Sequence, residues 1–71
     1  MNGKNSATCN EATAACYYLN AVAAARYGNN DAAINNLTNA ISTDTNYKGE
    51  AAIDLEFVNL RANEAFIALT K

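Results

Sequence analysis

Three small groups of residues in this sequence have types and spacings that could carry chemistry. Cys9 and Cys16 lie seven residues apart and could supply a nucleophile or form a disulfide. Glu50 and Asp54 stand at helical i, i+4 spacing, which is typical of paired carboxylates that exchange protons. The segment 44–49 places oxygen ligands at the first and third positions of a calcium loop and glycine at the sixth. Each pattern also has a purely structural explanation.

The two cysteines lack the partner that a cysteine nucleophile needs. The sequence contains no histidine, so neither thiol has an imidazole base. We interpret Cys16 as a small packing residue on a helix. Within one helix the two Cα atoms would lie roughly 10 Å apart, beyond disulfide reach, so a bridge requires Cys9 to lie outside the helix and fold back on it. The two cysteines therefore do not establish whether they form a disulfide or in which cellular compartment the protein lies.

Helix surfaces and helix caps explain the carboxylate pair and the calcium-like segment. No apolar pocket is implied around Glu50 and Asp54, and a solvated helix face is the ordinary place for such residues. The calcium pattern has lysine at its fifth position and leucine at its twelfth, whereas Asp44 and Asn46 are typical capping residues. Zinc ligands and a glycine-rich phosphate loop are missing. We therefore predict no enzyme activity, no catalytic residue, no metal site and no cofactor.

Composition predicts one small, folded, all-helical domain. The 71 residues are 51% hydrophobic and 17% charged, with a net charge of -2, and the mean hydropathy is -0.18. Such a chain is too apolar to be disordered and too polar in every window to insert into a membrane. Abundant alanine and asparagine favour close-packed helices with asparagine-rich caps and turns. Five scattered basic residues and a pI near 4.7 argue against a nucleic-acid partner.

Capping and stop signals predict where the helices begin and end. We expect residues 1–6 to form a disordered leader and 7–71 to form a single domain, a fragment of a longer protein. A capping-box pattern begins at Thr8, Gly28 supplies a left-handed stop, and Asn29 can cap the next helix. The short turn between the first two helices makes them an antiparallel hairpin. One or two further short helices follow, so the predicted helices cover about 9–27, 31–43, 48–58 and 63–70.

The end of the third helix is the least regular part of the pattern. Large apolar residues in 54–61 cannot all share one helical stripe, so the helix can break there. Asn63 can then cap a last short helix. We expect Phe57, Leu60 and Phe66 to pin this tail onto the second helix.

Residues 17–41 resemble a tetratricopeptide repeat. An early aromatic residue, a small residue four places later and a Gly-Asn turn match its first half, and alanine and aliphatic residues at helical spacing match its second. The residues that carry the resemblance are Tyr17, Ala21, Gly28, Asn29, Ala33, Ile34, Leu37 and Ala40, followed by the closing acidic residue Asp44. The tail 54–69 resembles the segment that closes many arrays of such repeats.

This resemblance implies a protein-protein interaction scaffold whose first helix supplies the contact surface. Its partner would be a protein, a peptide or neighbouring repeats of the parent chain. Tyr18 and Val22 replace the lysine and asparagine that grip a carboxylate in some members, so acidic chaperone tails are not expected. The other interpretation is that Tyr18 and Val22 pack on the next helix or on the leader. Carried over by position, the contact residues are Tyr18, Val22, Ala25 and Arg26, with Asn46 and Tyr47 at the rim.

A structural role is the alternative function. The chain would then be a terminal cap or a weak self-association unit of a larger helical-repeat protein, without a ligand of its own. Fewer than about three stacked repeats seldom bury enough surface for stability. Similar proteins are often found in the envelope of Gram-negative bacteria, so the resemblance implies a bacterial periplasmic or envelope location.

Overall fold

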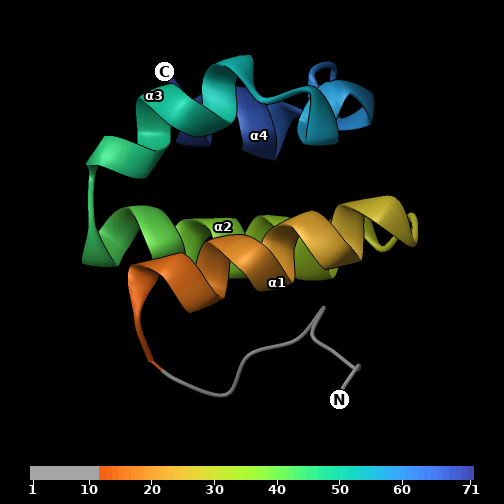
Figure 1. Ribbon diagram of the computed structural model, residues 1–71. Helices are drawn as coiled ribbons and strands as arrows, with labels where there is room; N and C mark the ends of the chain where they lie inside the picture. Colours follow the sequence, from red (N-terminus) through yellow and green to blue (C-terminus); the bar gives the residue numbers. More distant parts are fainter. Residues whose placement is uncertain (1–11) are drawn as a thin grey trace.

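All regular secondary structure in the described part of the chain is helical. The computed structural model describes residues 12–71, and this range contains no strand. Figure 1 shows two long helices that lie antiparallel, with shorter helices above them, which confirms the predicted fold class. The elements in chain order are α1 (Ala14–Arg26), α2 (Asn30–Thr43), α3 (Asn46–Ile53), the 3-10 helix η1 (Leu55–Leu60) and α4 (Glu64–Leu69).

Helix α1 begins later than the sequence pattern predicted. Its N-cap is Thr13, whose side-chain oxygen accepts a hydrogen bond from the amide of Cys16 at 3.2 Å. The predicted start near residue 9 is therefore wrong, because a second threonine with a capping hydroxyl lies closer to the packed part of the helix. The predicted leader, 1–6, and the capping box at Thr8 lie outside the described residues.

The hairpin turn follows the local signals closely. Gly28 adopts a positive φ of 78°, a left-handed conformation that side chains disfavour, and ends the first helix. Asn29 then caps α2, since its Oδ1 accepts from the amide of Ala32 at 3.2 Å. Both predicted roles are confirmed, and α2 begins and ends within one residue of its predicted bounds.

The third predicted helix is interrupted at Asp54. Its backbone is extended there (φ -75°, ψ 125°), and the chain continues as a 3-10 helix. A continuous helix over 48–58 is thus wrong, while the alternative of a break within 54–61 is confirmed. The last helix begins as predicted, because Asn63 Oδ1 accepts from the amides of Ala65 and Phe66.

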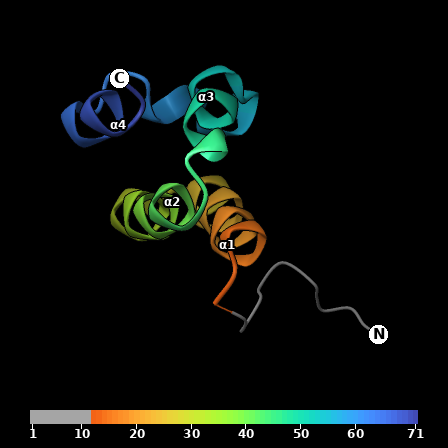
Figure 2. The same ribbon diagram turned by 90° about the vertical axis from the view of Figure 1, so that its left-hand side faces the viewer.

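The helices form two layers around one core. Figures 1 and 2 show α1 and α2 side by side in one layer and α3, η1 and α4 in the other. Phe66 lies on α4, which contacts α2 as predicted, but η1 packs against α1 instead. The core residues are Tyr18, Ala21, Ala33, Leu37, Ala40, Ala51, Phe57, Leu60 and Phe66.

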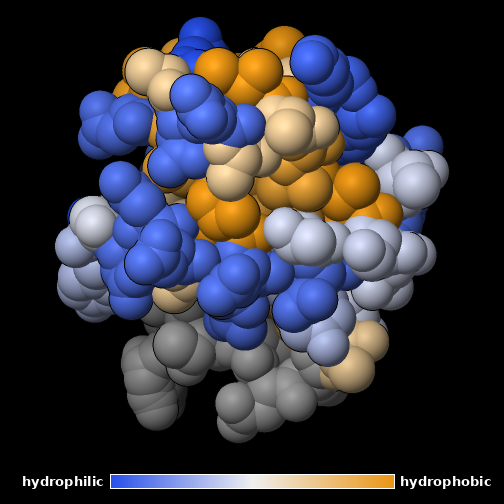
Figure 3. All heavy atoms as spheres, turned by 180° about the vertical axis from the view of Figure 1, so that it is seen from behind, coloured by the Kyte–Doolittle hydropathy of each residue, from blue (hydrophilic) through white to orange (hydrophobic). Residues whose placement is uncertain are grey.

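Partly buried apolar residues extend the core to one side of the molecule. Ile34 and Ile41 of α2 and Leu69 of α4 pack against the core from its edge. Seen from behind, apolar atoms run between the two layers, with hydrophilic side chains around them (Figure 3). Within residues 12–71, no helix combines the length and the apolar character that a membrane span requires.

Candidate partner-binding surface

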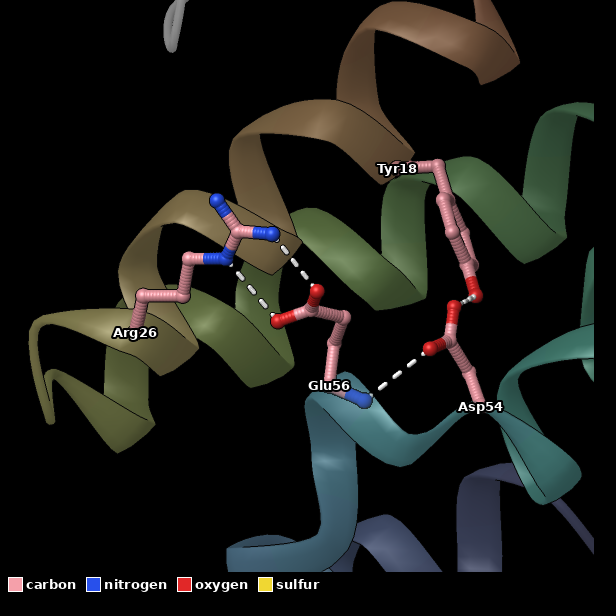
Figure 4. A network of polar contacts seen from close by, with 4 residues as sticks. All are labelled: Tyr18, Arg26, Asp54 and Glu56. Carbon is pink, nitrogen blue, oxygen red and sulfur yellow. Dashed lines mark hydrogen bonds and ion pairs between the residues drawn. The ribbon is translucent and has the colours of Figure 1, made fainter.

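A chain of polar contacts joins α1 to the segment that follows α3. The Tyr18 hydroxyl donates a hydrogen bond to Asp54 Oδ2 at 2.5 Å, while Asp54 Oδ1 accepts from the Glu56 amide at 2.9 Å. The guanidinium of Arg26 donates two bonds to the Glu56 carboxylate, at 2.9 and 2.6 Å. Figure 4 shows Tyr18 and Arg26 reaching from α1 toward the two carboxylates. One short segment thus holds the upper layer to α1 at two points.

Aromatic packing fixes the ring of Tyr18 inside the core. Its centroid lies 4.8 Å from the ring of Tyr47 and 5.6 Å from that of Phe57, which it meets edge to face. Phe57 in turn packs on Phe66 at 5.9 Å. Tyr18 is only 9% exposed. The prediction of an exposed tyrosine at this position is wrong, because its ring packs on α3 and η1; the alternative named the next helix or the leader as the packing partner.

The same contacts shift three ionisation equilibria. Burial, and after it the hydrogen bond to Asp54, raises the pKa of Tyr18 well above its ordinary value. The hydrogen bond from Arg26 lowers the pKa of Glu56 below its usual range, while partial desolvation of the Glu56 carboxylate raises this pKa and opposes the shift. The bond to Glu56 also raises the pKa of Arg26. The phenol therefore stays protonated as a donor, and the ion pair stays charged at neutral pH.

A shallow apolar groove lies on α1 beside this network. It has a volume of about 300 Å³ and is lined by residues spaced i, i+3, i+4, i+7 and i+8, which share one helical face. Leu19 and Tyr27 are 44% and 85% exposed, so the groove is open to solvent. We call this surface the α1 groove; its residues are Leu19, Val22, Ala23, Arg26 and Tyr27.

The α1 groove includes two of the six predicted contact residues. Val22 and Arg26 line it, although Val22 is also partly buried against the core. Ala25 and Tyr47 are partly buried against the core instead, and Asn46 is exposed at the start of α3, where its amide donates to Asp44 Oδ1 at 3.0 Å.

Sequence reasoning missed Leu19, Ala23 and Tyr27. These three residues recur every four positions, and helical geometry places them opposite the fully buried Ala21. That spacing was the one signal that could have identified them.

Two of the carboxylates that the sequence analysis singled out make contacts that hold the fold. Asp54, one member of the pair considered for proton transfer, holds Tyr18 and the Glu56 amide. Asp44, the first position of the calcium-like segment, is the C-cap residue of α2, and its Oδ1 accepts a hydrogen bond from the amide of Asn46, the first residue of α3. Residues 12–71 contain no group of three or more histidine, cysteine or acidic residues that could hold a metal ion.

Cys16 is disulfide-bonded and nearly buried. Its packing position on α1 agrees with the prediction for this residue. The other cysteine of the sequence, Cys9, lies outside the described residues.

No family model matches this sequence, and neither a curated protein nor a solved structure is significantly similar to it. The likeness to tetratricopeptide repeats stays a prediction from the sequence.

Proposed function

We propose that this chain is a non-catalytic scaffold of the tetratricopeptide-repeat type that binds a protein or peptide through the α1 groove. The observation that carries the proposal is the groove itself, an open apolar surface on one helix of a hairpin. Surfaces of this kind on a folded domain are typical of interaction sites.

The size and lining of the groove favour side chains of a partner over a cofactor. A volume of about 300 Å³ is at the lower end of the range for small-molecule sites. It suits one or two aliphatic side chains projecting from a peptide or helix. Tyrosine and arginine, which stand here as Tyr27 and Arg26, are the residue types that contribute most to binding energy at protein interfaces.

The charges that line the α1 groove indicate what kind of partner it suits. Among the described residues that line the groove, Arg26 is the only charged one, and the Glu56 carboxylate already accepts two hydrogen bonds from it. These described residues therefore offer no uncompensated charge to an acidic or a basic ligand. An uncharged aliphatic stretch is the best match, since it loses no hydration of its own charges on binding.

The layer above α1 supports this surface. Tyr18 and Arg26 are held by Asp54 and Glu56, so the α1 backbone cannot rotate freely relative to the rest of the fold. A groove on a fixed helix is already in its binding shape and loses little conformational entropy when it is occupied.

Selection of peptides from a random display library, followed by binding assays on individual peptides, tests the proposal. Leu19→Lys places a charge in the groove, whereas Asn35→Lys adds the same charge at an exposed position of α2. We expect the selected peptides to be rich in aliphatic residues. Their affinity should fall at least about tenfold for Leu19→Lys, a loss of about 1.4 kcal/mol, and stay unchanged for Asn35→Lys.

Amide chemical-shift changes on peptide addition should centre on the α1 groove. The proposal fails if no peptide is enriched, if both variants bind equally, or if the shifts map to another surface. Circular dichroism of both variants checks that they keep the helical content of the parent chain.

A further inference from the structure

Cys16 takes part in two stabilising contacts at the start of α1. It lies in the first turn of the helix and is 7% exposed. Its amide donates a hydrogen bond to Oγ1 of Thr13, the N-cap residue, and its sulfur belongs to a disulfide bond. The first turn of α1 is therefore held once through the backbone and once through a side chain.

The cysteine content of the sequence identifies the partner of Cys16. The chain contains two cysteines, so within one chain the second sulfur belongs to Cys9. Two cysteines seven positions apart in one helix would lie too far from each other to bond. Because α1 begins at Ala14 and its N-cap Thr13 is extended (φ -115°, ψ 155°), the spacing between the cysteines is not that of one continuous helix. The geometric obstacle to a bond between them is thereby removed.

Cys16 lies beside the core without belonging to it. On α1 the core begins at Tyr18, two residues further along, and Cys16 is not one of its members. The hydroxyl of Tyr18 holds Asp54 of the other layer. A bond that keeps the first turn of α1 in place thus supports this contact through a short stretch of helix, and replacing the sulfur would leave the core packing unchanged.

The core of this domain supplies little apolar area of its own. A single core in a domain of fewer than about 80 residues rarely provides much stability, and small domains often add disulfides to it. Alanine buries only one methyl group, much less than leucine or phenylalanine. Four of the nine core residues are alanines, namely Ala21, Ala33, Ala40 and Ala51. A cross-link therefore contributes a large share of the stability of this fold.

We propose that Cys9 and Cys16 form an intrachain disulfide that stabilises the first turn of α1 and makes the stability of the domain depend on redox conditions. When the bond forms, the two thiols lose two protons and two electrons. The electron acceptor is the disulfide of an oxidised thiol compound, which is reduced to two thiols by exchange. Such bonds persist in oxidising compartments and are reduced where thiol reductants are abundant. The domain is thus more stable in an oxidising compartment than in a reducing one.

The expected effect follows from the length of the loop that the bond closes. Residues 9–16 form a loop of eight residues, and closing it removes conformations from the unfolded chain. For a loop of this length in a domain of this size, reduction should lower the thermal midpoint by about 10–20 °C. Cys16 does not line the α1 groove, so failure of this proposal would leave the peptide-binding proposal untouched.

Glu11 lies between the two cysteines, so cleavage after glutamate tests which residues are bonded. The full chain is exposed to oxidised glutathione, unfolded in urea and digested with a protease that cuts after glutamate. Fragments 1–11 and 12–50 should stay joined until dithiothreitol is added. The intact oxidised chain should have the monomer mass of 7.5 kDa, two hydrogens less than the reduced chain. Fragments that separate without reductant, or a covalent dimer, would overturn the proposal.

Thermal unfolding followed by circular dichroism, with and without dithiothreitol, tests the effect on stability. The midpoint of the parent chain should fall by about 10–20 °C on reduction. Cys9→Ser leaves α1 unaltered and should unfold, in reductant, at the same temperature as the reduced parent chain. The double variant Cys9→Ser/Cys16→Ser should not respond to reductant.

Two outcomes of the thermal experiment would contradict the proposal. One is a parent chain whose midpoint does not change on reduction, and the other is a double variant that responds to dithiothreitol as strongly as the parent chain. A reduced chain that is unfolded at room temperature supports the proposal if oxidised glutathione restores its helical signal, and contradicts it if the signal does not return.

Discussion

Replacing Tyr18 by phenylalanine removes a single hydroxyl from the core and leaves Asp54 Oδ2 without its donor. The ring contacts with Tyr47 and Phe57 need no hydroxyl, so packing is conserved and the change isolates one hydrogen bond. That bond joins α1 to the segment after α3, across 36 positions of the chain. Its loss therefore measures how strongly the two layers are held together by polar contacts.

The expected loss follows from the type of bond and its surroundings. A hydrogen bond to a charged group contributes about 1.5–3 kcal/mol to stability. Asp54 is partly exposed, so water can replace the hydroxyl in part and the lower end applies. We expect Tyr18→Phe to lower the free energy of unfolding by about 1–2 kcal/mol. For a domain of this size the thermal midpoint then falls by about 7–13 °C.

Tyr47→Phe is the matched control. It makes the same change on the neighbouring ring, whose hydroxyl has no hydrogen-bond partner among residues 12–71. Urea unfolding followed by circular dichroism at neutral pH compares both variants with the parent chain. We expect Tyr47→Phe to stay within about 0.5 kcal/mol of the parent. If the two variants are equally stable, water satisfies Asp54 as well as Tyr18 does, and the reasoning is refuted.

Other predictions concern the turn and the titrating groups. Gly28→Ala should lower the free energy of unfolding by about 1 kcal/mol or more, because residue 28 has a positive φ. Gly49→Ala, inside α3 with open space around the added Cβ, should raise it by about 0.5–1 kcal/mol. Urea unfolding curves that rank the two variants in the reverse order would contradict this. The pKa of Tyr18 is raised in the folded state, so this tyrosine contributes its full stabilisation below the unfolded pKa near 10, and that contribution is lost as the pH rises further. In a titration followed by absorbance at 295 nm, one tyrosine should ionise only when the chain unfolds. The Tyr18→Phe variant should lack this late-ionising tyrosine. The pKa of Glu56 is lowered, so its contribution is present above the unfolded value near 4.3 and is lost as pH falls further; acid unfolding of Glu56→Gln should be less steep than that of the parent chain.

The sequence predicts those features whose signals lie within one turn of chain. Gly28, Asn29 and Asn63 act as predicted because a positive φ or a side-chain cap involves only neighbouring residues. The start of α1 was missed for a related reason. Thr8 and Thr13 carry the same capping group, and a local pattern cannot decide between them.

The candidate site was predicted less well because contacts between distant residues define it. Which face of α1 stays open to solvent depends on where η1 lies, and the position of η1 depends on Asp54 and Glu56 bonding to Tyr18 and Arg26. Nothing near Tyr18 in the sequence indicates those partners. Arg26 was identified correctly as an exposed residue, but its ion pair spans 30 positions and became visible only in the fold.

The separation of the layers in sequence also sets an order for folding. Helices α1 and α2 are joined by a turn of three residues, so their contacts close a short loop and can form early. The bond between Tyr18 and Asp54 closes a loop of 36 positions, and we expect it to form after the rate-limiting step. Substitutions at these two residues should then accelerate unfolding while leaving the refolding rate almost unchanged. The polar contacts that hold the upper layer would then determine the unfolding rate, and the formation of the α1–α2 hairpin would determine the folding rate.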